Sequence, residues 1–148
     1  MGLVSSERIR ILNDRPTRAT GGYVLYWSLM NRRVEQNHAL AHAAEIANAQ
    51  GLPLLVYESL TCEYPAANDR LHTFVLDGIP DNEAALRALG IGFFFYLRAQ
   101  RTGPNDVLYR LASRAHAIVT DDYPVFIAMR HNPRVAANLT VQYIAVDS

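Results

Sequence analysis

Lysine is absent from this chain of 148 residues, and arginine supplies all 14 of its basic side chains. Fourteen acidic residues balance them, so the formal net charge is zero. The arginines are scattered from Arg8 to Arg134, and we therefore interpret the missing lysine as a genomic bias in composition. Because phosphate contacts need a positively charged face, this balance argues against direct binding of nucleic acid.

Other absences exclude further classes of protein. Cys62 is the only cysteine, so no internal disulfide can form, and we expect a reducing, cytoplasmic compartment. No apolar run approaches the roughly 18 residues that a membrane span needs, and residues 1–8 lack the apolar segment of a signal peptide. We expect no membrane association. A hydrophobic fraction of 50% argues against disorder, and the length fits one domain.

Strand and helix patterns alternate along most of the chain. Residues 1–22 are polar and rich in arginine, and we expect them to form an extended arm before a domain over 23–148. The domain contains apolar runs typical of buried strands over 23–27, 54–59, 92–97, 117–120 and 139–146. Strands that alternate with helices predict a Rossmann-like, doubly wound α/β fold with a five-stranded parallel sheet and helices on both faces.

Four helices are expected between these strands. The first covers 33–50 and ends at Gly51, where a glycine can adopt the left-handed conformation of a helix end. Asn68 can cap the second helix, which Gly78 and Pro80 should break or kink before it resumes over 81–89. The third begins at 105 or 106, and the short fourth helix covers 124–132.

The loops that follow the strands are the places to look for chemistry. In an open doubly wound sheet, ligands bind beyond the carboxyl ends of the strands, where the strand order reverses. The candidate loops are 28–33, 60–65, 99–105 and 121–124. None carries a dinucleotide glycine fingerprint, a P-loop lysine or a Gly-x-Ser-x-Gly nucleophile elbow. The residues predict a small-molecule crevice without naming its ligand, and we assign no catalytic residue.

A polar stripe on the first expected helix contains two histidines. Glu35, His38, His42 and Glu45 fall on one helical face, and two imidazoles at i and i+4 can share a metal ion. A solvated polar face is the more frequent outcome of such a stripe, because no third ligand lies in a suitable loop. We therefore expect no metal site.

The pair Asp121-Asp122, directly after the fourth strand, leaves two interpretations open. Either carboxylate could bind a hydroxyl, a ring N–H or a cation. Either could also cap the helix that opens at Pro124, where acidic groups meet the positive end of the helix dipole. Arg33, with Arg32 before it, could contact an anionic ligand, although a structural ion pair is the more frequent outcome.

Several motifs resemble a known family. Residues 23–40 read YVLYWSLMNRRVEQNHAL, which resembles the start of photolyases and cryptochromes. The matching positions are Trp27, Arg33, Asn37, Ala39 and Leu40. Within the family, the sequence most resembles the class II cyclobutane pyrimidine dimer photolyases. The segments that resemble this branch are residues 10–16, 64–65 together with 69–74, 119–124 and 146–148. These motifs occur in the right order and cover essentially the whole chain.

The resemblance implies a fold and a role. Members of this family have an N-terminal α/β domain that holds an antenna chromophore, often a deazaflavin or a folate and sometimes a flavin such as FMN. A separate helical domain binds FAD and damaged DNA and performs the repair. The last strand here runs into the chain end, and we interpret the chain as one domain of a longer protein. We therefore expect no FAD on this chain, no repair by it alone, and a FAD-binding photolyase domain as its partner.

The expected role is light harvesting or structural support for that domain. The candidate chromophore site comprises Ser28, Leu29, Met30, Arg33, Asn37, Tyr57, Glu58, Asp121, Asp122 and Tyr123. Many relatives carry Phe-Arg-Arg-Asp where this chain has Ser-Leu-Met-Asn over 28–31, and fewer charges suit a flat apolar ring better than a polyglutamate tail. A nucleotide-binding α/β domain and a non-catalytic interaction module are the alternatives.

Overall fold

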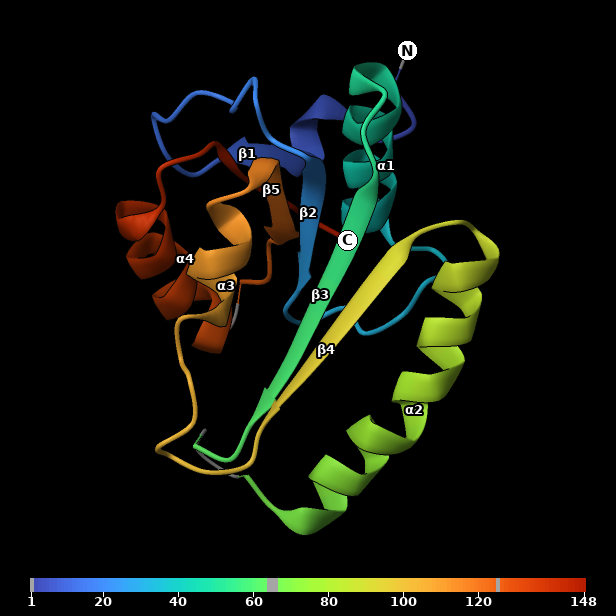
Figure 1. Cartoon of the computed structure of the whole chain (residues 1–148), viewed down its shortest axis with the longest axis vertical. Helices are drawn as coiled ribbons and strands as arrows, with labels where there is room; N and C mark the ends of the chain where they lie inside the picture. The colour runs from blue at the N-terminus through green and yellow to red at the C-terminus, as the bar shows by residue number, and fades with distance from the viewer. Residues whose placement is uncertain (1, 64–66, 125) are drawn as a thin grey trace.

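A computed structural model of the chain describes residues 2–63, 67–124 and 126–148. It contains a six-stranded sheet with helices on both faces (Figure 1). The strands are β1 (Ile9–Ile11), β2 (Tyr23–Ser28), β3 (Leu54–Thr61), β4 (Gly92–Arg98), β5 (Ala115–Asp121) and β6 (Tyr143–Val146). The helices are the short 3-10 turn η1 (Ser6–Arg8), α1 (His38–Gln50), α2 (Asp69–Ala88), α3 (Val107–Ala112) and α4 (Phe126–Asn138).

The strand order is β1-β6-β5-β2-β3-β4. Strands β2 to β6 run parallel, which confirms the predicted doubly wound α/β fold. The sheet has six strands instead of five, because β1 from the N-terminal arm pairs antiparallel with β6. Sequence reasoning missed β1 because three residues are too few to form a recognisable strand pattern.

Two expected helix boundaries are wrong. Helix α2 continues through Gly78 and Pro80, because Asn68 caps its first turn and the buried Leu86 anchors its last turns to the core. Helix α4 continues past Pro133 to Asn138. Its last turns carry Val135 and Ala136, which are buried in the core. In both helices, tertiary packing outweighs the local preference of proline to end a helix.

Two further boundaries differ from the expected ones. Helix α1 begins at His38 rather than at 33, because the Asn37 side chain accepts a 2.9 Å hydrogen bond from the Leu40 amide and caps the helix there. It ends at Gly51, as predicted, in the left-handed conformation with φ of 63°. The final strand is confined to Tyr143–Val146, so it begins four residues later than expected.

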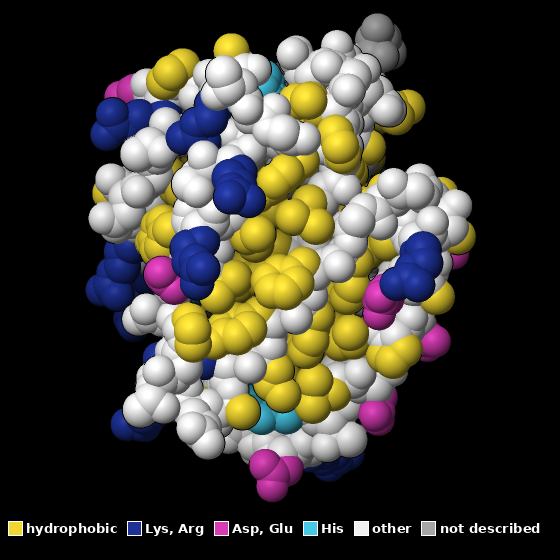
Figure 2. Space-filling view, viewed as in Figure 1, with side chains coloured by type: hydrophobic (Ala, Val, Ile, Leu, Met, Phe, Trp, Pro, Cys, Tyr) yellow, Lys and Arg dark blue, Asp and Glu magenta, His cyan; other side chains and the backbone are white. Residues whose placement is uncertain are grey.

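The core consists of two apolar layers, one on each face of the sheet. The first lies under α1 and the end of α2, and the second lies under α3 and α4. Figure 2 shows hydrophobic side chains gathered over β3 and β4, where Phe94 is 41% exposed. No helix in the described parts of the chain is long and apolar enough to cross a membrane.

The sheet topology fixes where a ligand site can lie. The chain passes from β2 to β3 and β4 on one side, and then returns to β5 on the other side of β2. The strand order therefore reverses between β2 and β5. The register places Trp27 beside Tyr57 and Thr120, so the carboxyl ends of these three strands meet at one edge of the sheet.

Candidate functional site

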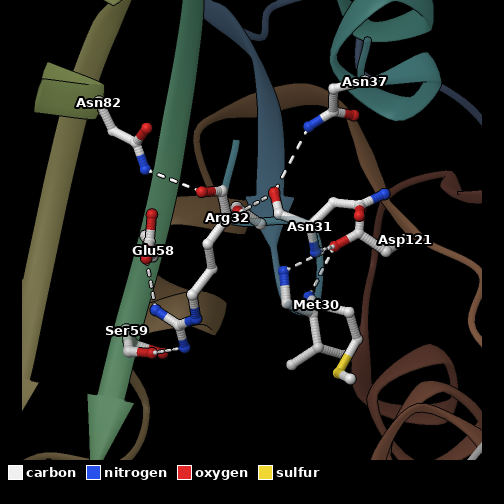
Figure 3. A network of polar contacts seen from close by, with 10 residues as sticks. Met30, Asn31, Arg32, Asn37, Glu58, Ser59, Asn82 and Asp121 are labelled. Carbon is white, nitrogen blue, oxygen red and sulfur yellow. Dashed lines mark hydrogen bonds and ion pairs between the residues drawn. The ribbon is translucent and has the colours of Figure 1, made fainter. Parts of the chain in front are cut away.

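A buried carboxylate joins the two strands at the reversal point. Asp121, the last residue of β5, is 1% exposed. Its Oδ1 accepts a hydrogen bond of 2.8 Å from the Tyr26 hydroxyl. Its Oδ2 accepts three hydrogen bonds from the backbone amides of Leu29, Met30 and Asn31, at 3.0, 2.7 and 2.9 Å (Figure 3). One side chain of β5 thus fixes the loop that follows β2.

Asn37 extends this network into helix α1. While its Oδ1 caps the helix, its Nδ2 donates to the Tyr26 hydroxyl at 3.0 Å and to the Arg33 carbonyl at 2.9 Å. Burial, reinforced by the adjacent Asp121 carboxylate, raises the pKa of Tyr26 well above its usual range. The Tyr26 hydroxyl therefore remains protonated and donates to Asp121.

A second network fixes the far side of the loop. The Arg32 guanidinium forms an ion pair with Glu58 of β3 and donates to the Ser59 carbonyl at 2.8 Å (Figure 3). Asn82 of α2 donates to the Arg32 carbonyl at 3.0 Å. Burial raises the pKa of Glu58, and the Arg32 charge opposes that shift. The loop after β2 is therefore tied to β3, β5, α1 and α2.

A crevice of about 550 Å³ opens at this edge of the sheet. The loop after β2 contributes Leu29, Met30 and Arg32 to its wall, and α2 contributes Leu71 and Val75. The other lining residues come from β2, the end of β3 and its following loop, β4 and α4, and are Trp27, Ser59, Leu60, Thr61, Glu63, Arg98 and His131. Trp27 is the only tryptophan of the chain. The crevice therefore has a largely apolar wall with a single indole at the end of a central strand.

The residues predicted from the sequence do not all meet in this crevice. Leu29 and Met30 line it. Ser28, Arg33 and Glu58 line a separate pocket of only about 10 Å³, which is no larger than one water molecule needs.

The other predicted residues lie elsewhere. Asn37 and Asp121 are buried in the network behind the loop. Tyr57 is buried on β3 and stacks on Phe94, with ring centroids 5.9 Å apart.

Asp122 and Tyr123 line a second cavity, of about 600 Å³, between β1, the loop after β5 and α4. Asp122 forms an ion pair of 2.8 Å with Arg10 of β1. This cavity is more polar than the crevice, because it also contains Arg8, Glu7 and other charged residues of the arm. Of the two acidic residues after β5, one therefore holds the loop after β2 and the other holds the arm.

The four residues of the predicted polar stripe, Glu35, His38, His42 and Glu45, do not all lie on helix α1. Glu35 lies before helix α1, in the turn that precedes its cap. His42 Nδ1 lies 3.2 Å from Glu45 Oε2 on the helix surface. Within residues 2–63, 67–124 and 126–148, no group of three or more His, Cys, Asp or Glu side chains is placed to hold a metal ion.

Of the twelve residues that line the crevice, two belong to the predicted chromophore site and four more fall in the candidate loops 28–33 and 60–65, so sequence reasoning missed the other half. Trp27 had a usable signal, because it ends a strand at the edge where ligands bind. Leu71 and Val75 lie four residues apart on α2, a spacing that in the sequence is typical of an ordinary buried helix face. Their place in the crevice depends on how α2 packs, which no local pattern encodes.

Comparisons with known proteins agree on the family and on the fold. The family model described as DNA photolyase matches residues 24–148. A deoxyribodipyrimidine photo-lyase of Methanothermobacter thermautotrophicus is 40% identical over 119 residues, which cover 80% of this chain and 26% of that protein. A deoxyribodipyrimidine photo-lyase of Arabidopsis thaliana is 32% identical over 126 residues, or 82% of this chain and 25% of that protein. The chain thus spans about a quarter of the length of these relatives.

Solved structures with a similar fold are more distant in sequence. The universal stress protein of Archaeoglobus fulgidus matches with a TM-score of 0.52 at 20% identity, over 82% of this chain and 98% of that one. The structure of that protein in complex with dAMP matches with a TM-score of 0.50, also at 20% identity, over 82% of this chain and 97% of that one. At this identity the likeness concerns the Rossmann-like fold alone.

Proposed function

Because this chain belongs to the DNA photolyase family, we propose that it is an antenna domain, which binds a light-absorbing chromophore and passes the excitation energy to a FAD-binding domain. The FAD-binding domain is the proposed partner, in the same longer chain or in a separate one. The chain by itself carries no proposed repair activity.

The crevice beyond β2 and β3 is the observation that carries this proposal. Its volume of about 550 Å³ lies within the range of roughly 300–1,000 Å³ in which proteins bind small molecules. Trp27, Leu29 and Met30 offer an indole and two apolar side chains to a flat ring system. A deazaflavin, a folate or a flavin such as FMN has a ring of this kind and absorbs visible or near-ultraviolet light.

The rigidity of the loop supports the same function. Energy transfer depends on the distance and orientation of the chromophore, so its binding site must be fixed. Asp121 holds the backbone of Leu29 and Met30 through hydrogen bonds of 3.0 and 2.7 Å, and Arg32 anchors the loop to β3. The two apolar side chains that would contact the ring are thus positioned before it binds.

Exposed apolar side chains support the proposed partner. Phe74 of α2 is 77% exposed, and Leu97 of β4 is 44% exposed. Hydrophobic side chains also gather over β3 and β4 in Figure 2. Contiguous exposed apolar surface often marks a place where another protein or domain packs.

Spectroscopy of the purified protein tests the antenna function. Protein from a deazaflavin-producing host should carry a chromophore, or should take up a deazaflavin, a folate or FMN when one is added. A colourless protein that binds none of them would contradict chromophore binding and would leave structural support as the role.

A matched pair of variants locates the binding site. Met30→Glu places a charge in the crevice wall and should weaken chromophore binding at least about tenfold, or ~1.4 kcal/mol. Met129→Glu makes the same change in the second cavity, at a side chain that is 65% exposed, and should leave the affinity unchanged. The opposite pattern would place the chromophore in the second cavity.

A further inference from the structure

The loop after β2 contains an anion-binding arrangement that the protein itself fills. The backbone N–H groups of Leu29, Met30 and Asn31 converge on one point at the reversal of the strand order. Consecutive amides of this kind form a concavity that binds phosphate or carboxylate groups, and α/β folds commonly place a ligand phosphate at such a point. Here the point is occupied by Asp121 Oδ2, and the carboxylate is buried (Figure 3).

The two arginines of the crevice wall also form ion pairs with carboxylates of the protein itself. Arg32 forms an ion pair with Glu58, which is 2% exposed, and binds the Ser59 carbonyl. Arg98 forms an ion pair with Glu63 and donates from Nε to the Gly103 carbonyl at 3.0 Å. Among the described residues that line the crevice, each guanidinium therefore has a carboxylate partner, and Glu63 is shared between Arg98 and Arg101.

The remaining polar groups add no cation to the crevice. Burial and the nearby Arg134 charge lower the pKa of His131, which disfavours the charged form of its imidazole. Arg101, beside Arg98, extends into solvent with 85% of its side chain exposed, and its Nε lies 3.4 Å from Glu63. A phosphate that entered the crevice would give up its hydration without gaining a free positive partner.

We propose that Asp121 acts as a built-in anion that occupies the phosphate position of the fold behind the crevice wall. Together with the carboxylates that pair the two arginines, it leaves the crevice no anion-binding group, so that the crevice selects an uncharged flat aromatic ligand over a phosphorylated one. The choice of ligand class rests on the proposed antenna function. The exclusion of phosphate does not, and it can be tested without any chromophore.

Riboflavin and FMN provide the test of ligand class, because they share one ring system and differ by a phosphate group. Quenching of Trp27 fluorescence reports occupancy of the crevice for both ligands. We expect riboflavin to bind at least as tightly as FMN. An affinity for FMN that is tenfold or more above that for riboflavin would overturn the proposal. Binding of neither flavin would count against the antenna function, and the response to inorganic phosphate would then decide whether Asp121 excludes phosphate.

Inorganic phosphate provides the independent test. Asp121→Gly empties the amide concavity, whereas Asp121→Asn keeps it filled with a side chain of the same size. At constant ionic strength, phosphate at about ten times its dissociation constant should raise the Tm of the glycine variant by roughly 3–6 °C. The native protein and the asparagine variant should show no rise specific to phosphate. An equal rise in the native protein, or none in a folded glycine variant, would overturn the proposal.

Glu58→Gln covers the case in which the glycine variant does not fold. It keeps the shape of the side chain but removes the carboxylate that neutralises Arg32. In the same measurement, phosphate should raise the Tm of Glu58→Gln above the rise produced by an equal ionic strength of chloride. No such difference would contradict the claim that internal carboxylates keep phosphate out of the crevice.

Discussion

The Tyr26 hydroxyl donates a hydrogen bond of 2.8 Å to Asp121 Oδ1 across the boundary between β2 and β5. Both residues are 1% exposed. The bond lies at the point where the strand order reverses, which in related architectures is where a ligand binds. In this chain the reversal point is closed by the protein's own side chains, and the open crevice lies beside it, along the ends of β2 and β3.

Removing the Tyr26 hydroxyl tests how much this hydrogen bond contributes to the stability of the fold. Tyr26→Phe leaves Asp121 Oδ1 without its donor and removes one of the acceptors of Asn37 Nδ2, both in a buried site. We expect the free energy of unfolding to fall by about 1–3 kcal/mol, measured by urea denaturation. Tyr123→Phe, at a side chain that is 41% exposed, is the control and should change stability by less than about 0.5 kcal/mol. Equal effects would contradict a stabilising role for the hydrogen bond between Tyr26 and Asp121.

The two asparagine helix caps allow a second comparison. Asn37 and Asn68 each accept a hydrogen bond of 2.9 Å from a backbone amide in the first turn of their helices. Asn68→Ala, at an exposed cap, should cost about 1 kcal/mol of stability. Asn37→Ala also removes the hydrogen bonds that its Nδ2 donates to the Tyr26 hydroxyl and the Arg33 carbonyl, so it should cost about 2 kcal/mol or more. Thermal unfolding of both variants measures the difference, and a larger loss for Asn68→Ala would refute it.

Glu58 gives stability a predictable dependence on pH. Burial raises its pKa above the ordinary value of 4.5, and Arg32 only partly opposes the shift. The folded state therefore binds this proton more tightly than the unfolded state does. The contribution of Glu58 to stability is complete below pH 4.5 and is lost as the pH rises through the folded pKa.

Glu58→Gln isolates this contribution. The free energy of unfolding of the native protein, minus that of the variant, should increase as the pH falls from 7 towards 4.5. Other titrating groups are common to both proteins and cancel in the difference. A difference that decreases over this interval would mean that the ion pair with Arg32 outweighs burial and lowers the pKa of Glu58.

Replacing the proline inside helix α2 should stabilise the protein. Pro80 lies in the helix interior, where it removes one backbone hydrogen bond, and its side chain is exposed. Pro80→Ala should raise the free energy of unfolding by about 1–3 kcal/mol. Pro53→Ala, in the loop before β3, is the control and should lower stability slightly because it frees the unfolded chain. A loss of stability in Pro80→Ala would indicate that the helix geometry around Pro80 is required for packing.

The parallel sheet could be predicted from the sequence because its strands are apolar on both faces. Runs such as 23–27 and 117–120 show no polar alternation, which is typical of strands covered by helices on both sides. The arm strand β1 has no such signal. Its Ile9 and Ile11 become a strand only because the edge of β6 is available for pairing.

The site was harder to predict, because its interactions join residues that are distant in sequence. Asp121 stands near Pro124, which favoured a capping interpretation, but its partners are the backbone amides of a loop 90 to 92 residues earlier. Backbone amides carry no sequence signature of their own. Leu29 and Met30 could be placed by their position after a central strand, whereas the α2 side of the crevice required the tertiary structure.

Energy transfer from Trp27 to an added chromophore tests the antenna function most directly, because this single tryptophan lies in the crevice wall. Riboflavin or a deazaflavin is titrated into the protein while tryptophan is excited selectively. We expect saturable quenching of Trp27 with sensitised emission from the chromophore, lost in Met30→Glu and retained in Met129→Glu. Absence of sensitised emission in the native protein, or its persistence in Met30→Glu, would contradict a chromophore in the crevice.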